Sequence, residues 1–457
     1  MKPIPLVRFD ALAGYARKPM IRILAEELAW FEHADERVLG LVNRDRADND
    51  FGGHIFGKDK RGRFRWIAGT DFKETPHLAR ISLRLEMERQ AALPDEEYYQ
   101  GDEQGEPVDF FVAFADPAKL HPSFVNLRDL EVYSPAKGII QPMMRWYEDA
   151  DGNFIEQFQT TGFDTRIWEL YLFAAFSELN LEITRIHAIP DFCCVNPFGE
   201  FCVEAVTVNP SRDKTGDIVP PPPIDTPEQL DDYLKAYMPL RFAGVLTAKL
   251  AKRYWEKEHV AGKPLIFAVA DFSSPGSMSH TRSAFERYVF GVEHDWERDA
   301  RGKLVITPKS VGTLKWGTKE VPAGFFDLPD SENISAVLFS NSGTISKFNR
   351  MGKLAGFGSE RVDLVRLGTR VNHDPDAVAP IGFQVNVGEL GYTESWSEGI
   401  AIWHNPKAKH PLDPDLVPGV AHHFLLPDGN VRSLTPEWFP LGSITLHSLR
   451  DQEAARA

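Results

Sequence analysis

Three carboxylates stand alone in apolar parts of the sequence, and their chemistry suits a divalent cation. Glu169 is the one acidic residue in the segment 167–176, and Glu204 is the one charged residue in 201–208. Asp191 follows a proline at the start of another strand-like segment. Carboxylate oxygens suit Mg²⁺ or Mn²⁺, and such a metal activates water and stabilises the charge on a phosphodiester under attack. The sequence therefore indicates a metal site built from these acids.

Glu169 also has a purely structural interpretation. A helix that is apolar on nearly all sides is buried, and a buried carboxylate without a partner costs on the order of several kcal/mol. A neighbouring cation such as Arg166 would supply that partner without any metal. Both interpretations of Glu169 stay open at the level of the sequence.

The segments that carry these acids begin with a helix and three strands. Apolar spacing predicts a helix over 167–179, with Asp164 as its N-cap. Strands are expected in the three segments that follow, at 181–187, 190–195 and 201–208. A turn around 196–199 would join the last two strands in a hairpin. Asp191 and Glu204 would then lie near one end of the sheet.

A second helix and a fourth strand complete this order. Thr226 and Gln229, with a proline next to the threonine, have the pattern of a capping box. They predict a helix that reaches about residue 258 and is bent by Pro239. The short apolar run 265–270 is typical of a buried strand.

This order of elements, with Glu169, a Pro-Asp pair ending at Asp191 and a Glu-Ala-Val run starting at Glu204, resembles the PD-(D/E)XK phosphodiesterase superfamily. The resemblance covers roughly residues 160–272, and that superfamily includes many restriction and repair nucleases. It implies a restriction-endonuclease-like αβββαβ core. It also implies a Mg²⁺ (or Mn²⁺) ion held by Asp191, Glu204 and the backbone carbonyl of Ala205, with Glu169 supporting the site or a second metal.

One position departs from the family pattern. The family's lysine, which positions the attacking water and steadies the phosphate, should stand at residue 206, which is Val206 here. Such families sometimes recruit this lysine from the following helix, where Lys249 is the preferred candidate and Lys252 the second. The alternatives are that both are ordinary surface lysines beside another activating group, or that the site is degenerate.

A basic segment surrounds these lysines. Between residues 235 and 263, seven basic residues stand against two acidic ones. Phosphate contacts are expected from five of them: Arg241, Lys249, Lys252, Arg253 and Lys257. A solvated helix surface explains the same pattern. A second basic cluster of Lys347, Arg350 and Lys353 is a further candidate for phosphate binding, or else a β-turn and hairpin.

The length of 457 residues predicts two or three domains. We expect an N-terminal α+β domain over 1–145, with a helix over 21–31 followed by strands. A hairpin at 149–153 introduces the nuclease-like core, 146–295. The remainder, 296–457, reads as a mostly-β domain with some helix. The whole chain is thus expected to be α/β, or α+β overall.

The net charge and the lengths of the apolar runs exclude some classes of binding partner. A net charge of −15 argues against a uniformly basic protein that coats nucleic acid or membranes, although a local basic groove is compatible with it. The longest apolar run, around 170–176, is far too short to cross a bilayer. These features predict a soluble, cytoplasmic protein without a membrane partner.

The resemblance implies a metal-dependent nuclease that cleaves DNA or RNA, with DNA favoured, and a role in bacterial antiviral defence would fit it. A protein partner or homo-oligomer is compatible with the sequence. The whole chain also faintly resembles uncharacterised bacterial proteins labelled "glycosaminoglycan attachment site", a label that implies no mechanism. The alternative, which Val206 favours, is a catalytically degenerate nuclease fold that binds nucleic acid or protein.

Overall fold

The computed structural model describes residues 1–147, 152–184 and 186–451. Helices and strands are interspersed along these residues, so the protein has a mixed α/β structure, as the sequence predicts. No helix within these ranges is both long and apolar enough to cross a bilayer. Residues 149–151 of the expected hairpin lie outside the described ranges.

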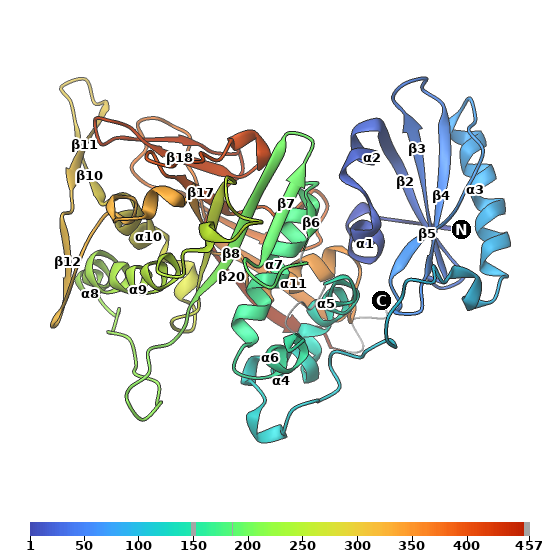
Figure 1. Ribbon diagram of the computed structural model, residues 1–457, viewed down its shortest axis with the longest axis horizontal. Helices are drawn as coiled ribbons and strands as arrows, with labels where there is room; N and C mark the ends of the chain where they lie inside the picture. The colour runs from blue at the N-terminus through green and yellow to red at the C-terminus, as the bar shows by residue number, and fades with distance from the viewer. Residues whose placement is uncertain (148–151, 185, 452–457) are drawn as a thin grey trace.

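The N-terminal region is an antiparallel sheet with a helix packed on it, at one end of the molecule in Figure 1. Its strands follow chain order: β1 (Lys2–Ile4), β2 (Ala25–His33), β3 (Val38–Asp45), β4 (Phe51–Lys58) and β5 (Phe64–Gly69). α3 (Pro76–Ala91) buries Leu83 and Met87 against this sheet.

The helix expected over 21–31 is wrong beyond its first residues. α2 (Pro19–Leu24) is helical, but the chain enters β2 at Ala25. β2 pairs on one side with β1 and on the other with β3. These two ladders of backbone hydrogen bonds outweigh the local helical spacing, which is a weak preference.

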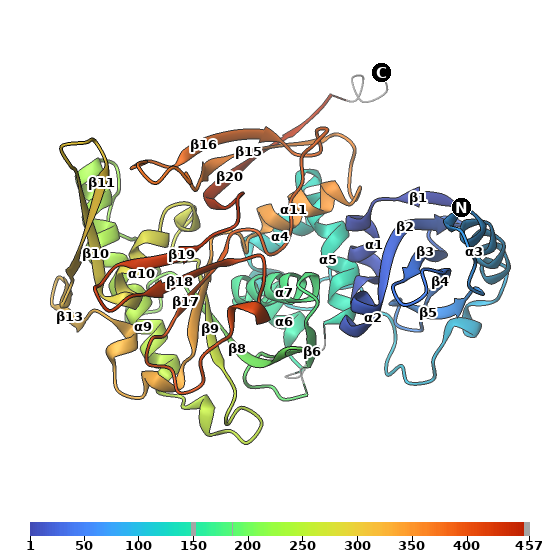
Figure 2. The same cartoon turned by 90° about the horizontal axis from the view of Figure 1, so that it is seen from above.

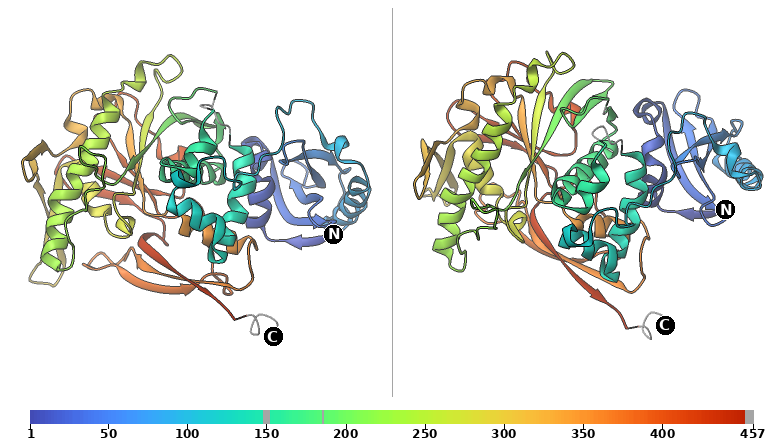
Figure 3. Two further views of the ribbon diagram at one scale, coloured as in Figure 1. Left: turned by 90° about the horizontal axis from the view of Figure 1, so that it is seen from below. Right: turned by 60° about the horizontal axis from the view of Figure 1, so that its bottom comes forward.

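Short helices connect the N-terminal sheet to the rest of the chain. They are α1 (Leu6–Ala13), α4 (Pro122–Asp129), α5 (Ser134–Trp146) and α6 (Phe154–Gln159). α5 contacts α1 on one side and α7 (Phe163–Glu178) on the other. Figure 3 shows α5, in teal, and α1, in dark blue, between the N-terminal sheet and the central sheet.

The central sheet contains eight of the described strands, in the order β19-β18-β17-β14-β9-β8-β7-β6. One half comes from β6 (Glu182–Thr184), β7 (Phe192–Asn196), β8 (Gly199–Val208) and β9 (Leu265–Asp271). The other half comes from β14 (Ala336–Ser340), β17 (Ile400–His404), β18 (Ala421–Leu425) and β19 (Val431–Leu434). β6, β7 and β8 form an antiparallel meander, and β9 lies parallel to β8.

Two helices cover opposite faces of β8, as Figure 1 shows. Side chains alternate between the faces of a strand. Val203 and Ala205 therefore pack in the same apolar core as α7, whereas Cys202 and Val206 pack with α9 (Met238–Leu250). The sequence order helix, three strands, helix, strand is thus present, and its strands lie close to where the sequence predicts them.

The helix boundaries differ from the expected ones. α7 begins after Gly162, so Asp164 lies in its first turn and is not the N-cap. The capping box of Thr226 and Gln229 is present and opens α8 (Pro227–Asp232). A π-helical turn, Tyr233–Tyr237, joins α8 to α9. α9 ends at Leu250 instead of near residue 258, and Arg253 then adopts a left-handed backbone that no helix continues through.

Part of the second half of the chain joins the central sheet. β14, β17, β18 and β19 belong to the central sheet, and the expected boundary between residues 295 and 296 falls inside β10 (Val292–Arg298). α10 (Arg282–Phe290) precedes β10. Three more strands complete two hairpins, namely β11 (Leu304–Ser310), β12 (Thr313–Trp316) and β13 (Lys319–Pro322).

A smaller antiparallel sheet ends the chain. It consists of β15 (Val362–Arg370), β16 (Ile381–Asn386) and β20 (Pro440–Leu449). Figure 2 shows this sheet beside α11 (Ile345–Leu354). The basic cluster of Lys347, Arg350 and Lys353 lies on α11, so its interpretation as a turn and hairpin is wrong.

Candidate active site

Asp191 is bound to the strand that carries Glu204. It directly precedes β7, whose first residue Phe192 pairs with Val203 of β8. Its Oδ2 accepts a hydrogen bond of 2.7 Å from the backbone N–H of Ala205. The hairpin of β7 and β8 thus brings Asp191 next to the residue that follows Glu204, as the sequence predicts.

Glu204 lies mid-strand and is turned toward the chain that follows α9. Its side chain is almost fully buried. Oε1 accepts hydrogen bonds from Nζ of Lys249 at 2.5 Å and from the hydroxyl of Tyr254 at 3.0 Å. Oε2 is buried and has no hydrogen-bond partner among the described residues. One oxygen of this carboxylate is therefore held in place, while the other has its bonding capacity unused.

Glu169 has the partner that its structural interpretation requires. It is buried on α7, and Nη1 of Arg166 lies 2.8 Å from Oε2 and 3.0 Å from Oε1. The hydroxyl of Tyr147 donates to Oε2 as well. Arg166 is itself oriented by Gln157, whose side-chain oxygen accepts at 2.6 Å. These contacts make Glu169 part of a polar network on the side of the central sheet that α7 covers.

The three acids influence one another electrostatically. Burial raises the pKa of Asp191 well above its usual value, and the negative charges of Glu169 and Glu204 raise it further. The N–H of Ala205 and the ammonium group of Lys249 oppose this rise. A buried carboxyl group with a strongly raised pKa beside other acids is a feature of many functional sites, although structural networks also produce it.

The oxygen donors of Asp191 and Glu204 fit a magnesium ion in chemistry and number. Mg²⁺ is usually bound by one or two carboxylates and keeps several waters. The unpartnered Oε2 of Glu204 is the kind of group that such an ion would satisfy. Among the described residues, no group of three or more His, Cys, Asp or Glu side chains is arranged to hold a metal ion. A metal would therefore depend on these two carboxylates and on the carbonyl of Ala205, without Glu169 as a direct ligand.

Lys249 comes from the second helix and reaches the motif strand. Its side chain is 30% exposed, so it connects the buried Glu204 with solvent. Val206, at the family's lysine position, packs in the apolar core between β8 and α9, where a lysine would be desolvated. Lys252 lies beyond the end of α9 and is exposed, with no ion pair among the described residues. Of the two candidate lysines, Lys249 is the one that contacts a motif carboxylate.

The other basic residues of this segment have varied surroundings. Arg241 donates to the backbone oxygen of Asn209. Arg253 pairs with Glu256 at 2.7 Å and with Asp330 at 3.0 Å. Lys257 is exposed and, like Lys252, has no ion pair within the described part of the chain. The exposed lysines flank the turn that carries Tyr254, next to Glu204.

The second basic cluster does not form an open phosphate site. Nζ of Lys347 lies 2.6 Å from Glu394, and Nη2 of Arg350 lies 2.8 Å from the same carboxylate. Both basic side chains are buried. Lys353 donates to the carbonyl oxygen of Val362. These cations are occupied by partners within the protein.

Tyr147 and Tyr254 are site residues that the sequence analysis missed. Each donates a hydroxyl hydrogen bond to one of the predicted carboxylates, Glu169 or Glu204. Both come from segments other than those that carry the acids. The sequence offers little to single them out, because tyrosine is common in apolar segments and only folding brings it to a carboxylate.

Comparisons with known proteins leave the site to be interpreted from its own geometry. No protein-family model, no curated protein and no solved structure matches the chain.

Proposed function

We propose that the protein is a metal-dependent phosphodiesterase of the PD-(D/E)XK type, acting on DNA or RNA with DNA as the favoured substrate. The arrangement of α7, β6, β7, β8, α9 and β9 supports this proposal. Three antiparallel strands are followed by a helix and a strand parallel to the third, with the two helices on opposite faces. The proposed nuclease core is the restriction-endonuclease-like αβββαβ unit, roughly residues 160–272.

The contact between Lys249 and Glu204 carries the proposal. A degenerate site has no need for a lysine at the motif glutamate, and a surface lysine would extend into solvent. Instead Nζ of Lys249 lies 2.5 Å from Oε1 of Glu204. The lysine absent at position 206 is thus replaced, in our proposal, by Lys249 from the second helix.

Each residue would have a separate role. Asp191, Glu204 and the carbonyl of Ala205 would hold the Mg²⁺ or Mn²⁺ ion. When bound, this ion would supply an activated water and stabilise the charge on the phosphate. The N–H of Ala205 fixes Oδ2 of Asp191, and Tyr254 fixes Oε1 of Glu204. Lys249 would contact a phosphate oxygen of the substrate when an ion bound at Glu204 balances the charge of that carboxylate.

The substrate would run along the segment that follows α9. Lys252 and Lys257 are exposed there and are free of ion pairs in the described part of the chain. Phosphate contacts of this kind supply affinity without reading sequence. The proposed place of action is the cytoplasm, and bacterial defence against foreign DNA is the proposed role.

The first test is cleavage of plasmid and single-stranded DNA and RNA in Mg²⁺, Mn²⁺ or EDTA. We expect metal-dependent cutting by the wild type and a loss of about 100-fold or more in Glu204→Gln. Glu200→Gln is the matched control, because Glu200 lies on the same strand but pairs with Lys263 away from the site. Equal activity in all three proteins would contradict the proposal.

The role of Lys249 has its own test. Lys249→Met should lower the cleavage rate by about 100-fold, the usual loss when one preorganised charge donor is removed. Lys252→Met should weaken substrate binding in a salt-dependent way and leave the rate at saturation nearly unchanged. Similar, small effects of both substitutions would show that Lys249 has no catalytic part.

A second candidate function is a nucleic-acid-binding or protein-binding module without catalysis. It is favoured by the pairing of Glu169 with Arg166, because no group of three acids is arranged to hold a metal among the described residues. Binding of the same substrates without cutting in any metal would support this candidate, as would unchanged binding after Glu204→Gln.

A further inference from the structure

A cavity of about 820 Å³ lies next to the C-terminal sheet, within the size range of small-molecule sites. Arg366 of β15 lines it together with Glu394 and Glu398, which lie in the segment that leads to β17. Trp438 and Phe439, just before β20, contribute an aromatic wall. None of these residues belongs to the proposed nuclease site.

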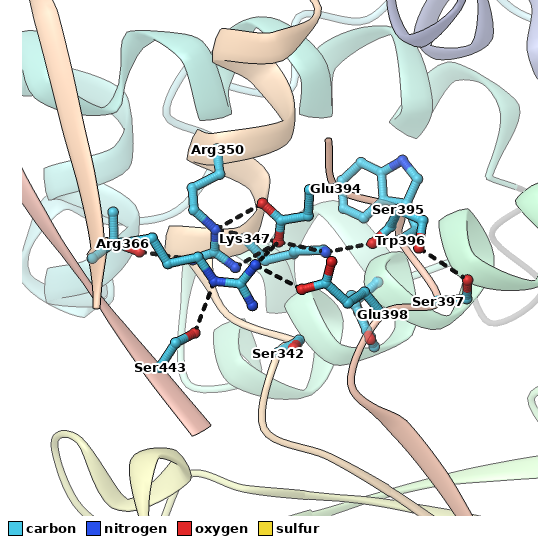
Figure 4. Close-up of polar contacts among 12 residues, drawn as sticks. Ser342, Lys347, Arg350, Arg366, Glu394, Ser395, Trp396, Ser397, Glu398 and Ser443 are labelled. Atoms are coloured by element: carbon cyan, nitrogen blue, oxygen red, sulfur yellow. Dashed lines mark hydrogen bonds and ion pairs between the residues drawn. The ribbon is translucent and has the colours of Figure 1, made fainter. Parts of the chain in front are cut away.

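Behind this cavity lies a buried cluster of charges, shown in Figure 4. Lys347 and Arg350 of α11 both bind Glu394, whose side chain is fully buried. Arg366 binds Glu398 through Nη1 at 2.6 Å and lies 3.5 Å from Glu394. Three cations therefore share two carboxylates.

The charge of Lys347 also acts on a third carboxylate, Glu178 of α7. Glu178 approaches from α7, but its oxygens accept hydrogen bonds from the backbone N–H groups of Trp396 and Ser397 at 2.9 Å. No ion pair joins it to the three cations among the described residues. Glu389, another residue that lines the cavity, is exposed and accepts from Asn386, so solvent screens its charge.

The guanidinium group of Arg366 has unused donors. Its Nε donates to the hydroxyl of Ser443 at 3.1 Å, and Nη1 is taken by Glu398. Nη2 is buried and has no hydrogen-bond partner among the described residues. Arg366 as a whole is only 1% exposed, so bulk solvent reaches little of this side chain. A buried donor without a partner is costly, and an acceptor from a ligand would remove that cost.

The aromatic wall is held in place by its neighbours. The ring of Trp438 lies 5.2 Å from that of Phe383, measured between ring centres. The guanidinium groups of Arg366 and Arg370 lie over the outer faces of this pair, at 5.5 Å from Phe383 and 5.1 Å from Trp438. Trp438 remains 40% exposed, which leaves surface for a flat ligand group.

We propose that this cavity binds an organic anion, in which a carboxylate or phosphate monoester group accepts from Nη2 of Arg366 and an aromatic or apolar body packs on Trp438. The anion would supply the acceptor that Nη2 of Arg366 lacks among the described residues. The site is independent of the proposed nuclease chemistry, since it shares no residue with it.

The test is calorimetric titration of the full chain with four probes: benzoate, phenyl phosphate, benzamide and inorganic phosphate. Benzoate and benzamide have nearly the same shape but differ in charge. We expect the two aromatic anions to bind once per chain, and at least one of them to bind about tenfold more tightly than benzamide. Which of the two binds better distinguishes a carboxylate ligand from a phosphate ligand. Inorganic phosphate, which lacks the ring, should bind more weakly than phenyl phosphate.

Two substitutions test separately how charge and ring packing contribute to the affinity for the ligand. Arg366→Lys retains a cation for Glu398 but lacks the second terminal nitrogen, so it should abolish the preference for benzoate over benzamide. Trp438→Ala should weaken both aromatic anions and preserve that preference. Arg361→Lys is the matched control, because Arg361 pairs with exposed Glu131 away from the cavity.

The proposal is wrong if no aromatic anion binds, if benzamide binds as tightly as benzoate and phenyl phosphate, or if Arg361→Lys loses as much affinity as Arg366→Lys. If Arg366→Lys fails to fold by circular dichroism, Trp438→Ala decides the location. Unchanged anion binding in that variant would also overturn the proposal.

Discussion

Two buried clusters of charge in this protein shift the pKa of an acid in opposite directions. At the proposed nuclease site, burial and the charges of two neighbouring acids raise the pKa of Asp191 well above its usual value. In the C-terminal cluster, burial alone would raise the pKa of Glu394, but Arg350, Lys347 and Arg366 hold it well below its usual value. The first cluster resists the ionised form of its acid, whereas the second stabilises it.

The acids of the proposed nuclease site lack a full set of cations within the protein. Glu394, in contrast, already has its cations. Acids gathered without enough cations raise the free energy of the folded protein, and a metal ion would relieve this cost. Glu394 instead accepts hydrogen bonds from three side chains, including the hydroxyl of Tyr392 at 2.6 Å, and lies 3.5 Å from Arg366. Its cluster links α11 to the chain before β17, which is a structural task. The unused donor of Arg366 is the exception there, and it is where we propose a ligand.

The largest expected effect is on stability in the C-terminal cluster. Glu394→Gln removes the carboxylate that three buried cations share and should lower the free energy of unfolding by about 3–5 kcal/mol. Urea denaturation at pH 7 measures this. Glu332→Gln is the control, because its solvent-exposed pair with Lys409 should contribute little to stability. Equal effects of the two substitutions would remove the contrast between the clusters.

A smaller effect of opposite sign is expected at the nuclease site. Asp191→Asn retains an acceptor for the N–H of Ala205 but removes a charge that its neighbours repel. In EDTA at pH 8, the variant should therefore unfold at higher urea concentration, with a gain of about 1 kcal/mol. The same variant should lose metal-dependent cleavage. A destabilised Asp191→Asn protein would mean that the acid is held by compensating contacts instead.

The pH dependence should differ between these two substitutions. Since the pKa of Glu394 is lowered by folding, its stabilising effect is complete above about pH 4.5 and is lost as the pH falls further. The difference in the free energy of unfolding between wild type and Glu394→Gln should therefore become smaller in acid.

The opposite trend is expected for Asp191. Since the pKa of Asp191 is raised by folding, the gain in stability of Asp191→Asn should be absent near pH 3.8 and grow as the pH rises. Unfolding curves from pH 3 to pH 8 in EDTA test both slopes, and parallel curves would contradict them.

Local patterns in the sequence were sufficient for many of the elements around the proposed site. The apolar run that became α7, the runs that became β8 and β9, and the capping box of Thr226 all have short-range physical causes. The same is true of the burial of Glu169 and Glu204, since single charges in apolar segments must be buried with them. The expected contact of Lys249 with the site followed from a resemblance rather than from its own surroundings in the chain.

Other features could not be predicted from neighbouring residues in the sequence, because they depend on contacts between distant segments. The helical spacing of residues 21–31 gave way to β2, because pairing with β1 and β3 is decided by distant strands. The pairing of β14 with β9 joins strands separated by about sixty residues of intervening chain, and no local pattern indicates it. Lys347 and Arg350, which the sequence offered as phosphate ligands or as part of a turn, are buried and pair with Glu394, which lies beyond β15 and β16 in the chain.

The sequence alone indicated that Glu169 and Glu204 would be buried, because hydrophobic burial follows from the residues next to them along the chain. Only the tertiary structure decided what each buried charge would meet: Arg166 for Glu169, Lys249 for Glu204 and Glu394 for Arg350. The physical reason is that burial is a property of a segment, whereas an ion pair depends on the distance between two side chains, which the packing of separate elements sets.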